Sequence, residues 1–405
     1  MPPDRISEIA SKLTGTLLSP FSYNDNAPAS PVEPPAAWTL LAFASREVGG
    51  TFSKKVPSDN PITGAITNSL LADTPTLDAD LGTALPSQSL LSAVTADTQG
   101  LYTGQPSIVE RVVVAGLRVV NAALGLFGFQ SVLPFASLQI PIFTDGKPPF
   151  FVTAGLNVQR SEFEGMPVYT LQRPGSTSEE VIVALHGGGY VGQISIFHWM
   201  TYARIARDTG ATVVVPVYPV APQGTAAVVV PATADLLSDL IDKRGSENVS
   251  VLGDSAGGGL ALAAVQELVR RGDPTPSRLV LLAPWLDATV SDPASQTIRD
   301  PLLDVPTLRK DGLLWAGGLD PSDPLVSPIN GSLEGLPPTY VYSGSLDLLS
   351  PETLRLRERA LAEGRTNFTF ILRKDEIHDW PTFPFLPEAH RDLPAIERQL
   401  LGTDV

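Results

Sequence analysis

The 405-residue sequence has no cysteine, only four histidines, and many fewer basic than acidic side chains. Without cysteine there is no disulfide framework and no thiolate chemistry, and the scattered histidines argue against a zinc site. The 28 basic and 43 acidic residues give a net charge of −15. An acidic surface repels phosphate backbones, so a nucleic-acid partner is not expected. We expect no metal and no cofactor.

The sequence also has no apolar run of the roughly 18 residues that a membrane-spanning helix needs. The nearest run, VVVAGLRVVNAALGLFGF at 112–129, is interrupted by Arg118 and Asn121. Either a buried or capping helix or an interfacial, lipid-facing helix would explain it. The first residues, MPPDRISEIASKL, lack the basic start and apolar core of a signal peptide, so no export route is visible.

The residue composition along the chain predicts three parts. Residues 1–105 form an N-terminal extension, partly linker-like because 19–38 is rich in Pro, Ala, Ser and Asn. Residues 106–150 form an apolar cap or lid-like segment, and 151–405 form the main domain, with a cap insertion at about 284–337. The role of residues 1–105 and the oligomeric state are not indicated by any pattern.

The main domain alternates short apolar runs with helical runs. We predict strands at 180–187, 212–219, 248–253, 278–285, 338–345 and 367–373, and helices at 197–210, 231–245, 255–272, 351–364 and 388–401. Continuous apolar strands alternating with helices are typical of an α/β fold, with a mostly parallel sheet covered on both faces. Sites in such sheets form at the carboxyl ends of the strands.

One stretch at such an end reads VLGDSAGGGLALAA, from Val251 to Ala264. Its Gly253-Asp254-Ser255-Ala256-Gly257 matches G-x-S-x-G between a strand and a helix, which is the context of a nucleophile elbow. A phosphate-binding loop is disfavoured because Gly259-Leu260 stands where Lys-Ser or Lys-Thr is needed. A small-residue helix-packing motif remains an alternative.

A second stretch, HGGGY at 186–190, follows a predicted strand. Three glycines in a row cost backbone entropy, and bare N–H groups aimed at a developing oxyanion would justify that cost. We assign the oxyanion hole to Gly188, Gly189 and Ala256; a flexible glycine turn is the plainer explanation. We expect His186 to shape this loop by hydrogen bonds, and Asp254 to fix the elbow rather than to transfer protons.

A serine nucleophile needs a base and an orienting acid, which follow it in the chain order Ser, acid, His. His378 follows the last predicted strand in a loop and is the expected base, whereas His390 is expected on the surface of the closing helix. Asp347 directly follows a predicted strand and is the expected acid. Its competitors are Glu352, which could simply complement a helix dipole, and Glu376 and Asp379, which are expected to point elsewhere.

With these residues in place, the chain from about residue 150 resembles the hormone-sensitive-lipase-like branch of the α/β-hydrolases. HGGGY, GDSAGG, the SxDxL pattern at 345–349 and His378 carry the resemblance. The chain is more similar still to the lipase domain of mycobacterial PE-family triacylglycerol lipases, through SIFHWM, VLLAPWLD, DPLVSP, GLPPTYVYSGSLD and IHDW. It departs from the family at Ser350, where a second Asp is often found, and in its first 100 residues, which do not read as paired Ala-rich helices.

The resemblance implies a triad of Ser255, Asp347 and His378, the same three oxyanion donors, and ester hydrolysis on acyl lipids such as triacylglycerol. It also implies a location outside the cell or in its envelope, with possible contact to a lipid surface. Residues 112–129 and 132–138 could line an acyl tunnel. The rival functions are a short-chain carboxylesterase and, more remotely, a non-catalytic lipid-binding protein on a hydrolase fold. The sequence does not indicate the acyl chain length or the natural ester.

Overall fold

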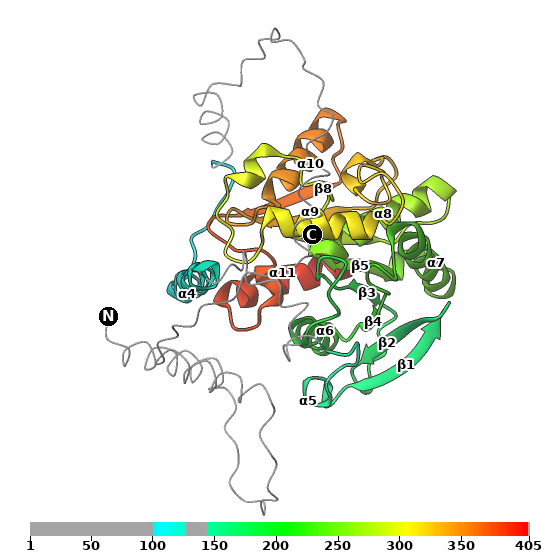
Figure 1. The fold of residues 1–405 in the computed structure, drawn as a ribbon. Helices are drawn as coiled ribbons and strands as arrows, with labels where there is room; N and C mark the ends of the chain where they lie inside the picture. Colours follow the sequence, from blue (N-terminus) through cyan, green and yellow to red (C-terminus); the bar gives the residue numbers. More distant parts are fainter. Residues whose placement is uncertain (1–99, 127–143, 404–405) are drawn as a thin grey trace, which may run out of the picture. The chain divides into compact units, whose positions relative to one another are not determined.

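The computed structural model describes residues 100–126 and 144–403. Their centre is an eight-stranded sheet with the order β1-β2-β4-β3-β5-β6-β7-β8 (Figure 1). Neighbouring strands from β4 to β8 pair in parallel, and β2 pairs antiparallel with β1 and β4. The strands are β1 Asn157–Phe163, β2 Met166–Gln172, β3 Val181–Leu185, β4 Thr212–Pro216, β5 Val249–Asp254, β6 Arg278–Leu282, β7 Thr339–Gly344 and β8 Phe368–Arg373.

Helices cover both faces of this sheet, and each face has its own apolar core. One core joins the sheet to α7, α8, α9 and α10, and the other joins it to α4, α6 and α11. β3, β4 and β5 are buried along their whole length, and most of their residues are therefore apolar. The helices are α4 Ile108–Leu126, α5 Phe150–Thr153, α6 Ile196–Thr209, α7 Ala226–Arg244, α8 Ser255–Arg271, α9 Val305–Ala316, α10 Ser350–Ala362 and α11 Pro387–Leu401.

The expected α/β fold is confirmed, and so are the six strands and five helices predicted for it. One boundary is wrong: α7 begins at Ala226 rather than at 231, so Pro231 lies inside the helix and does not start it. The hairpin of β1 and β2 was not foreseen because β1, NVQRSEF, is exposed along almost its whole length and shows no apolar alternation.

The predicted cap insertion at 284–337 falls between β6 and β7 and contains α9. The helix starts where Asp304 accepts a hydrogen bond from the Thr307 N–H at 2.9 Å, an ordinary N-cap. It packs against the HGGGY loop, since the rings of Trp315 and Tyr190 stack with centroids 3.9 Å apart.

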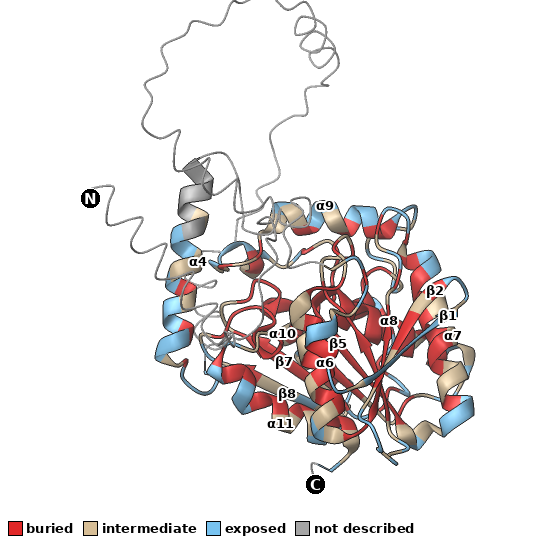
Figure 2. Ribbon diagram, turned by 90° about the horizontal axis from the view of Figure 1, so that it is seen from below, coloured by how far each residue is buried: buried red, intermediate tan, exposed pale blue. Residues whose placement is uncertain are grey.

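The segment before the main domain joins the sheet at β8. The Thr103 N–H donates to the Leu372 carbonyl at 3.0 Å, and the Lys374 N–H donates to the Thr103 carbonyl at 2.9 Å. Helix α4 follows and lies beside α11; Figure 2 shows much of its surface exposed, in contrast to the buried strands. Within residues 100–126 and 144–403, no helix is both long and apolar enough to cross a membrane.

Candidate active site

Ser255 lies between the carboxyl end of β5 and the first turn of α8. Its φ of 52° is in the left-handed region, which a non-glycine residue rarely adopts and which stores local strain. A Cβ at Gly257 would collide with the Leu185 carbonyl oxygen, and one at Gly253 would collide with the Gly257 carbonyl oxygen. Both glycines of the G-x-S-x-G motif are therefore required by close backbone contacts around the serine.

The structure brings Ser255, His378 and Asp347 together. The Nε2 atom of His378 lies 2.9 Å from Ser255 Oγ, and its Nδ1 atom lies 3.0 Å from Asp347 Oδ2. Each residue follows the end of a different strand: β5, β7 and β8. All three are buried, so these hydrogen bonds are shielded from water. The arrangement is that of a nucleophile, a base and an orienting acid.

The sequence predicts that Asp379 points away from His378, and this prediction is wrong. The Asp379 Oδ2 atom lies 3.1 Å from His378 Nε2, the same nitrogen that faces Ser255. Asp379 has a φ of 54°, and this left-handed backbone turn places its carboxyl group against the preceding imidazole ring. Burial raises the pKa of Asp379 to about 7, and His378 opposes that rise.

Electrostatics at His378 favour the protonated ring. Burial alone lowers the pKa of His378, but Asp379 and then Asp347 outweigh burial and hold that pKa well above its usual range. In the neutral ring, Nε2 can accept one hydrogen bond, for example from the Ser255 hydroxyl. Asp379 contacts the same nitrogen, so a proton must lie between Nε2 and the Asp379 carboxyl group for that contact to be favourable. Loss of this shared proton at raised pH leaves His378 neutral and able to act as a base.

Asp347 accepts a backbone hydrogen bond, and the neighbouring backbone is bound by Asp300, a carboxyl that was not predicted from the sequence. The Asp347 Oδ1 atom accepts the Leu349 N–H at 2.8 Å, so Ser350 need not supply the support that a second Asp would give. Asp300, from the segment between β6 and β7, accepts the Leu348 N–H at 2.9 Å. Burial, followed by the nearby Asp347 charge, raises the pKa of Asp300 to about 7.

The glycine loop lies directly against the serine. A Cβ on Gly187 would come within 3.0 Å of Ser255 Cβ. Gly188 and Gly189 have φ values of 122° and 62°, and within the described residues their N–H groups donate to no protein acceptor. Ala256 is the second residue of α8, where N–H groups have no partner inside the helix. The loop that adjoins Ser255 and the start of α8 thus provide free N–H donors, which an oxyanion hole requires.

Asp254 joins the loop to the elbow, as expected. Its Oδ2 atom accepts hydrogen bonds from the Gly187 N–H at 2.9 Å and from His198 Nε2 at 2.8 Å. Burial would raise the pKa of Asp254, but His198 and Gly187 outweigh burial and lower it, so the carboxylate stays charged. His198 is a contributor that the sequence analysis missed. The SIFHWM stretch was the available signal, because Ser195 caps α6 and shares a capping box with His198.

Within the described residues, the remaining candidates make no hydrogen bond to the serine hydroxyl. His186 is fully buried and stacked on Tyr218, and burial lowers its pKa to about 4. His390 is exposed and contacts Arg204, as expected. Glu352 does more than complement a helix dipole: it is buried, and its Oε2 atom accepts the N–H groups of Leu286 and Asp287.

The acyl-lining segments are only partly described. Residues 112–126 belong to α4, whereas 127–129 and 132–138 lie outside the described residues.

Asp311 on α9 comes near the glycine loop, since its Oδ2 atom would lie 3.5 Å from a Cβ at Gly189. For cation binding, Glu110, Glu376 and Glu388 form one cluster of possible oxygen ligands.

Comparisons with known proteins show the fold family and the enzyme class. Residues 182–382 match the family described as having the alpha/beta hydrolase fold. The chain is 42% identical to a "Triacylglycerol lipase" of Mycobacterium tuberculosis over 315 residues, which cover 74% of this chain and 67% of that protein. It is 34% identical to an "Acetyl-hydrolase" of Streptomyces hygroscopicus over 54% of this chain and 74% of that protein.

Solved structures agree as well. An esterase from the bacterial hormone-sensitive lipase family superposes with a TM-score of 0.58 at 31% identity, covering 62% of this chain and 86% of that one. The sheet, the serine elbow and the family match point to one enzyme class. The chain therefore belongs to the α/β-hydrolase fold family, in its hormone-sensitive-lipase-like branch, and is a carboxylic ester hydrolase.

Proposed function

We propose that this enzyme hydrolyses the ester bonds of acyl lipids such as triacylglycerol, with Ser255 as nucleophile, His378 as general base and Asp347 as orienting acid. The observation that carries the assignment is the chain of contacts from Ser255 Oγ to His378 Nε2, at 2.9 Å, and from His378 Nδ1 to Asp347 Oδ2, at 3.0 Å.

The reaction has two halves. Ser255 Oγ attacks the ester carbonyl carbon while His378 Nε2 takes the hydroxyl proton, and Asp347 holds the ring in the required tautomer. The negative oxygen of the tetrahedral intermediate accepts hydrogen bonds from the N–H groups of Gly188, Gly189 and Ala256. His378 then protonates the leaving alcohol, and a water activated by the same nitrogen hydrolyses the acyl-enzyme. Each oxyanion donor typically contributes about 3–4 kcal/mol to transition-state stabilisation.

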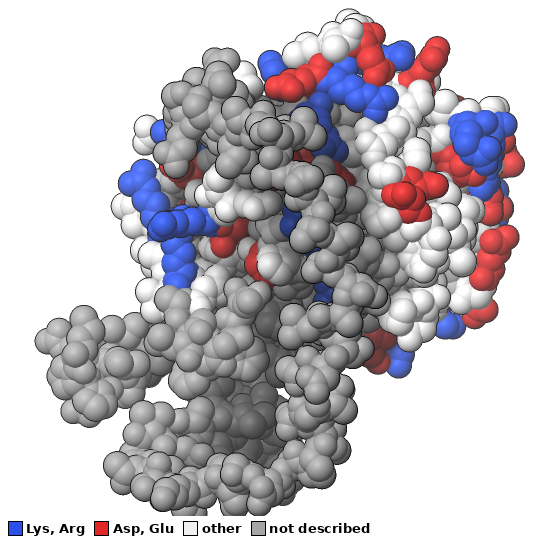
Figure 3. All heavy atoms as spheres, turned by 45° about the horizontal axis from the view of Figure 1, so that its top comes forward, with Lys and Arg blue, Asp and Glu red and all other residues white. Residues whose placement is uncertain are grey.

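A lipid substrate is supported by the exposed apolar stripe of α4. Ile108, Val112 and Val119 are 79%, 56% and 69% exposed, and their spacing places them on one face of the helix. Arg111 and Arg118 are exposed on the same helix. An apolar face flanked by basic residues is typical of a helix that lies on a lipid surface. Figure 3 shows both signs of charge around the edge of the described part.

The second candidate is a short-chain carboxylesterase, which the similarity to an acetyl-hydrolase favours. A series of p-nitrophenyl esters with acyl chains of two to sixteen carbons, followed by emulsified triolein against tributyrin, separates the two. Activity that extends to the long chains and to triolein supports the lipase, whereas activity confined to short chains supports the esterase.

A fluorophosphonate probe tests the assigned nucleophile. Wild-type protein should be labelled once and Ser255→Ala should not, while the matched control Ser322→Ala, changed at an exposed turn, should react like wild type. Labelling that persists in Ser255→Ala would exclude Ser255. An unreactive but folded wild type would favour the non-catalytic lipid carrier.

We further propose that the enzyme acts outside the cell or in its envelope. The proposal rests on the similarity to the mycobacterial lipase group. Fractionation of a host expressing the tagged full chain tests it, with recovery in the culture medium or envelope as the expected result and recovery in the cytosol alone as the contrary one.

A further inference from the structure

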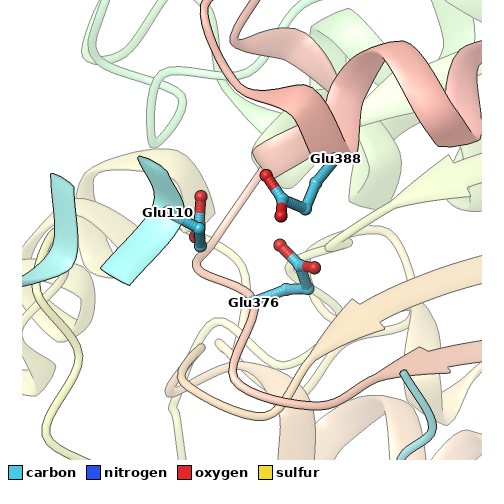
Figure 4. A group of neighbouring side chains, drawn as sticks. All are labelled: Glu110, Glu376 and Glu388. Carbon is cyan, nitrogen blue, oxygen red and sulfur yellow. The ribbon is translucent and has the colours of Figure 1, made fainter. Parts of the chain in front are cut away.

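Three buried glutamates meet beside the loop that carries His378. Glu110 lies on α4, Glu376 lies two residues before His378, and Glu388 lies in the first turn of α11. Their side chains point toward one another in Figure 4, and one carboxylate oxygen from each lies within 4.8 Å of the others. The three residues are 0%, 1% and 2% exposed, so water does not screen their charges.

The protein supplies few donors to these carboxylates. The Ser107 N–H donates to Glu388 Oε1 at 2.6 Å, and Arg391 Nη2 donates to Glu376 Oε1 at 3.4 Å. The other oxygens of Glu376 and Glu388, and both oxygens of Glu110, have no partner at hydrogen-bond distance and angle among the described residues. The backbone N–H of Ile377 is the one protein donor close enough to Glu110 to lower its pKa, and burial outweighs it. Buried polar atoms almost always have a partner, and an unpaired buried charge is costly.

The surroundings of Glu110 point most directly to a bound ligand. Glu110 comes from a helix more than 260 residues away in sequence from the other two, is fully buried, and directs two unpartnered oxygens into the space that Glu376 and Glu388 face.

Asp392 pairs with Arg373 as well as with Arg391, so the Asp392 and Arg373 charges cancel. The three glutamates and the Arg391 guanidinium then leave a net charge of −2. A single divalent cation would neutralise it.

We propose that Glu110, Glu376 and Glu388 bind one divalent cation, and that this cation is Ca²⁺. The ligands are all carboxylate oxygens, which hard cations prefer. Ca²⁺ accepts six to eight oxygens in flexible geometry, and three carboxylates that can each bind through one or two oxygens suit it. Mg²⁺ requires a near-ideal octahedron and keeps several waters, which suits a buried site of this kind less well.

The cation would join three separate parts of the chain. Each of these parts, α4, α11 and the loop before His378, contributes one glutamate, and the three negative charges repel one another. A Ca²⁺ ion bound to all three carboxylates would remove this repulsion. The Glu376 carbonyl also accepts the Leu346 N–H at 3.0 Å, directly before Asp347. The site therefore supports the loops that carry the base and the acid without contacting the substrate, and its role is to stabilise the fold.

Protons are the competing occupants. Burial raises the pKa of Glu110 to about 7, and burial followed by Glu110 raises the pKa of Glu376 to about 8, so carboxyl groups could share protons here instead. The test is therefore run at pH 8.5, where protons compete least.

The experiment uses the full chain, freed of metal with EDTA and then dialysed. Calorimetric titration with CaCl₂ should give one site per chain. A 100-fold excess of Ca²⁺ over its Kd should raise Tm by roughly 4 °C relative to EDTA. Glu110→Gln and Glu388→Gln should each abolish both responses, and the control Glu334→Gln, changed at an exposed position, should retain them.

No heat of binding and no change in Tm for the wild type would overturn the proposal, as would Ca²⁺ binding retained by both site variants. A rise in Tm with MgCl₂ equal to that with CaCl₂ would overturn the choice of Ca²⁺. Two site variants are used because one of them could fail to fold. The other then still tests whether Ca²⁺ binding depends on the site. None of these readouts depends on ester hydrolysis.

Discussion

Asp379→Asn should shift the acid limb of the pH–activity profile to lower pH. His378 can accept the Ser255 proton only when its ring is neutral, so kcat/KM rises as pH rises through the pKa of His378. That pKa is held well above its usual range by Asp379 and Asp347, against burial. Asparagine removes the negative charge 3.1 Å from Nε2, so the ring loses its proton at lower pH.

The size of the shift follows from the contact that is lost. A hydrogen bond to a charged group contributes about 1.5–3 kcal/mol, and one pKa unit corresponds to about 1.4 kcal/mol. The acid limb should therefore move down by about one to two pH units. At a fixed pH on this limb where Asp379 is charged in the wild type, the fraction of active enzyme should rise about tenfold or more.

The assay is kcat/KM on a soluble p-nitrophenyl ester, measured from pH 5 to pH 9 for the wild type and for Asp379→Asn. Asp242→Asn, an equal change of charge at an exposed position on α7, serves as the control and should leave the limb in place. An acid limb that stays put, or moves to higher pH, in a folded Asp379→Asn variant would refute the claim that Asp379 controls the protonation of His378.

Three further changes test the elbow, the glycine loop and the lipid-facing helix. Gly257→Ala should lower the free energy of unfolding by about 1–3 kcal/mol in chemical denaturation, because the new methyl group meets the Leu185 carbonyl; unchanged stability would contradict this. Asp254→Ala breaks a buried ion pair and should cost about 3–5 kcal/mol of stability. It should also lower kcat more than it raises KM, since the Gly187 N–H loses its acceptor; a pure KM effect in steady-state kinetics would speak against that role. Val119→Asp should reduce activity on emulsified triolein about tenfold while leaving tributyrin in solution unaffected, and equal losses on both would count against a lipid-facing helix.

The parts of the fold that could be predicted are those in which local pattern and tertiary position agree. β5 and the start of α8 surround Ser255 with an apolar strand, two obligatory glycines and a helical run, so one short stretch of sequence predicts the turn. Asp347 and His378 could be proposed because the carboxyl ends of parallel strands meet at one edge of the sheet.

What could not be predicted depends on the folded arrangement. Asp379 contacts His378 only because of a left-handed backbone turn, for which no glycine or asparagine gave a signal. Glu110 meets its two partners through the packing of α4 on α11, and no spacing along the chain reports that contact. The expectation that no metal binds considered only the histidines and cysteines, and the proposed Ca²⁺ titration tests it. In β1, polar residues at a sheet edge produce no apolar alternation, so the strand is not visible in the sequence.

The pairing of Thr103 with β8 has a consequence for association between molecules. β8 is the last strand of the sheet, and an open edge offers unpaired N–H and C=O groups to any other chain with an extended segment. Thr103 occupies part of that edge through its bonds to Leu372 and Lys374. A shortened version of the protein that began at α4 would uncover it. Residues 100–107, which carry this contact, should therefore be kept in any truncated form.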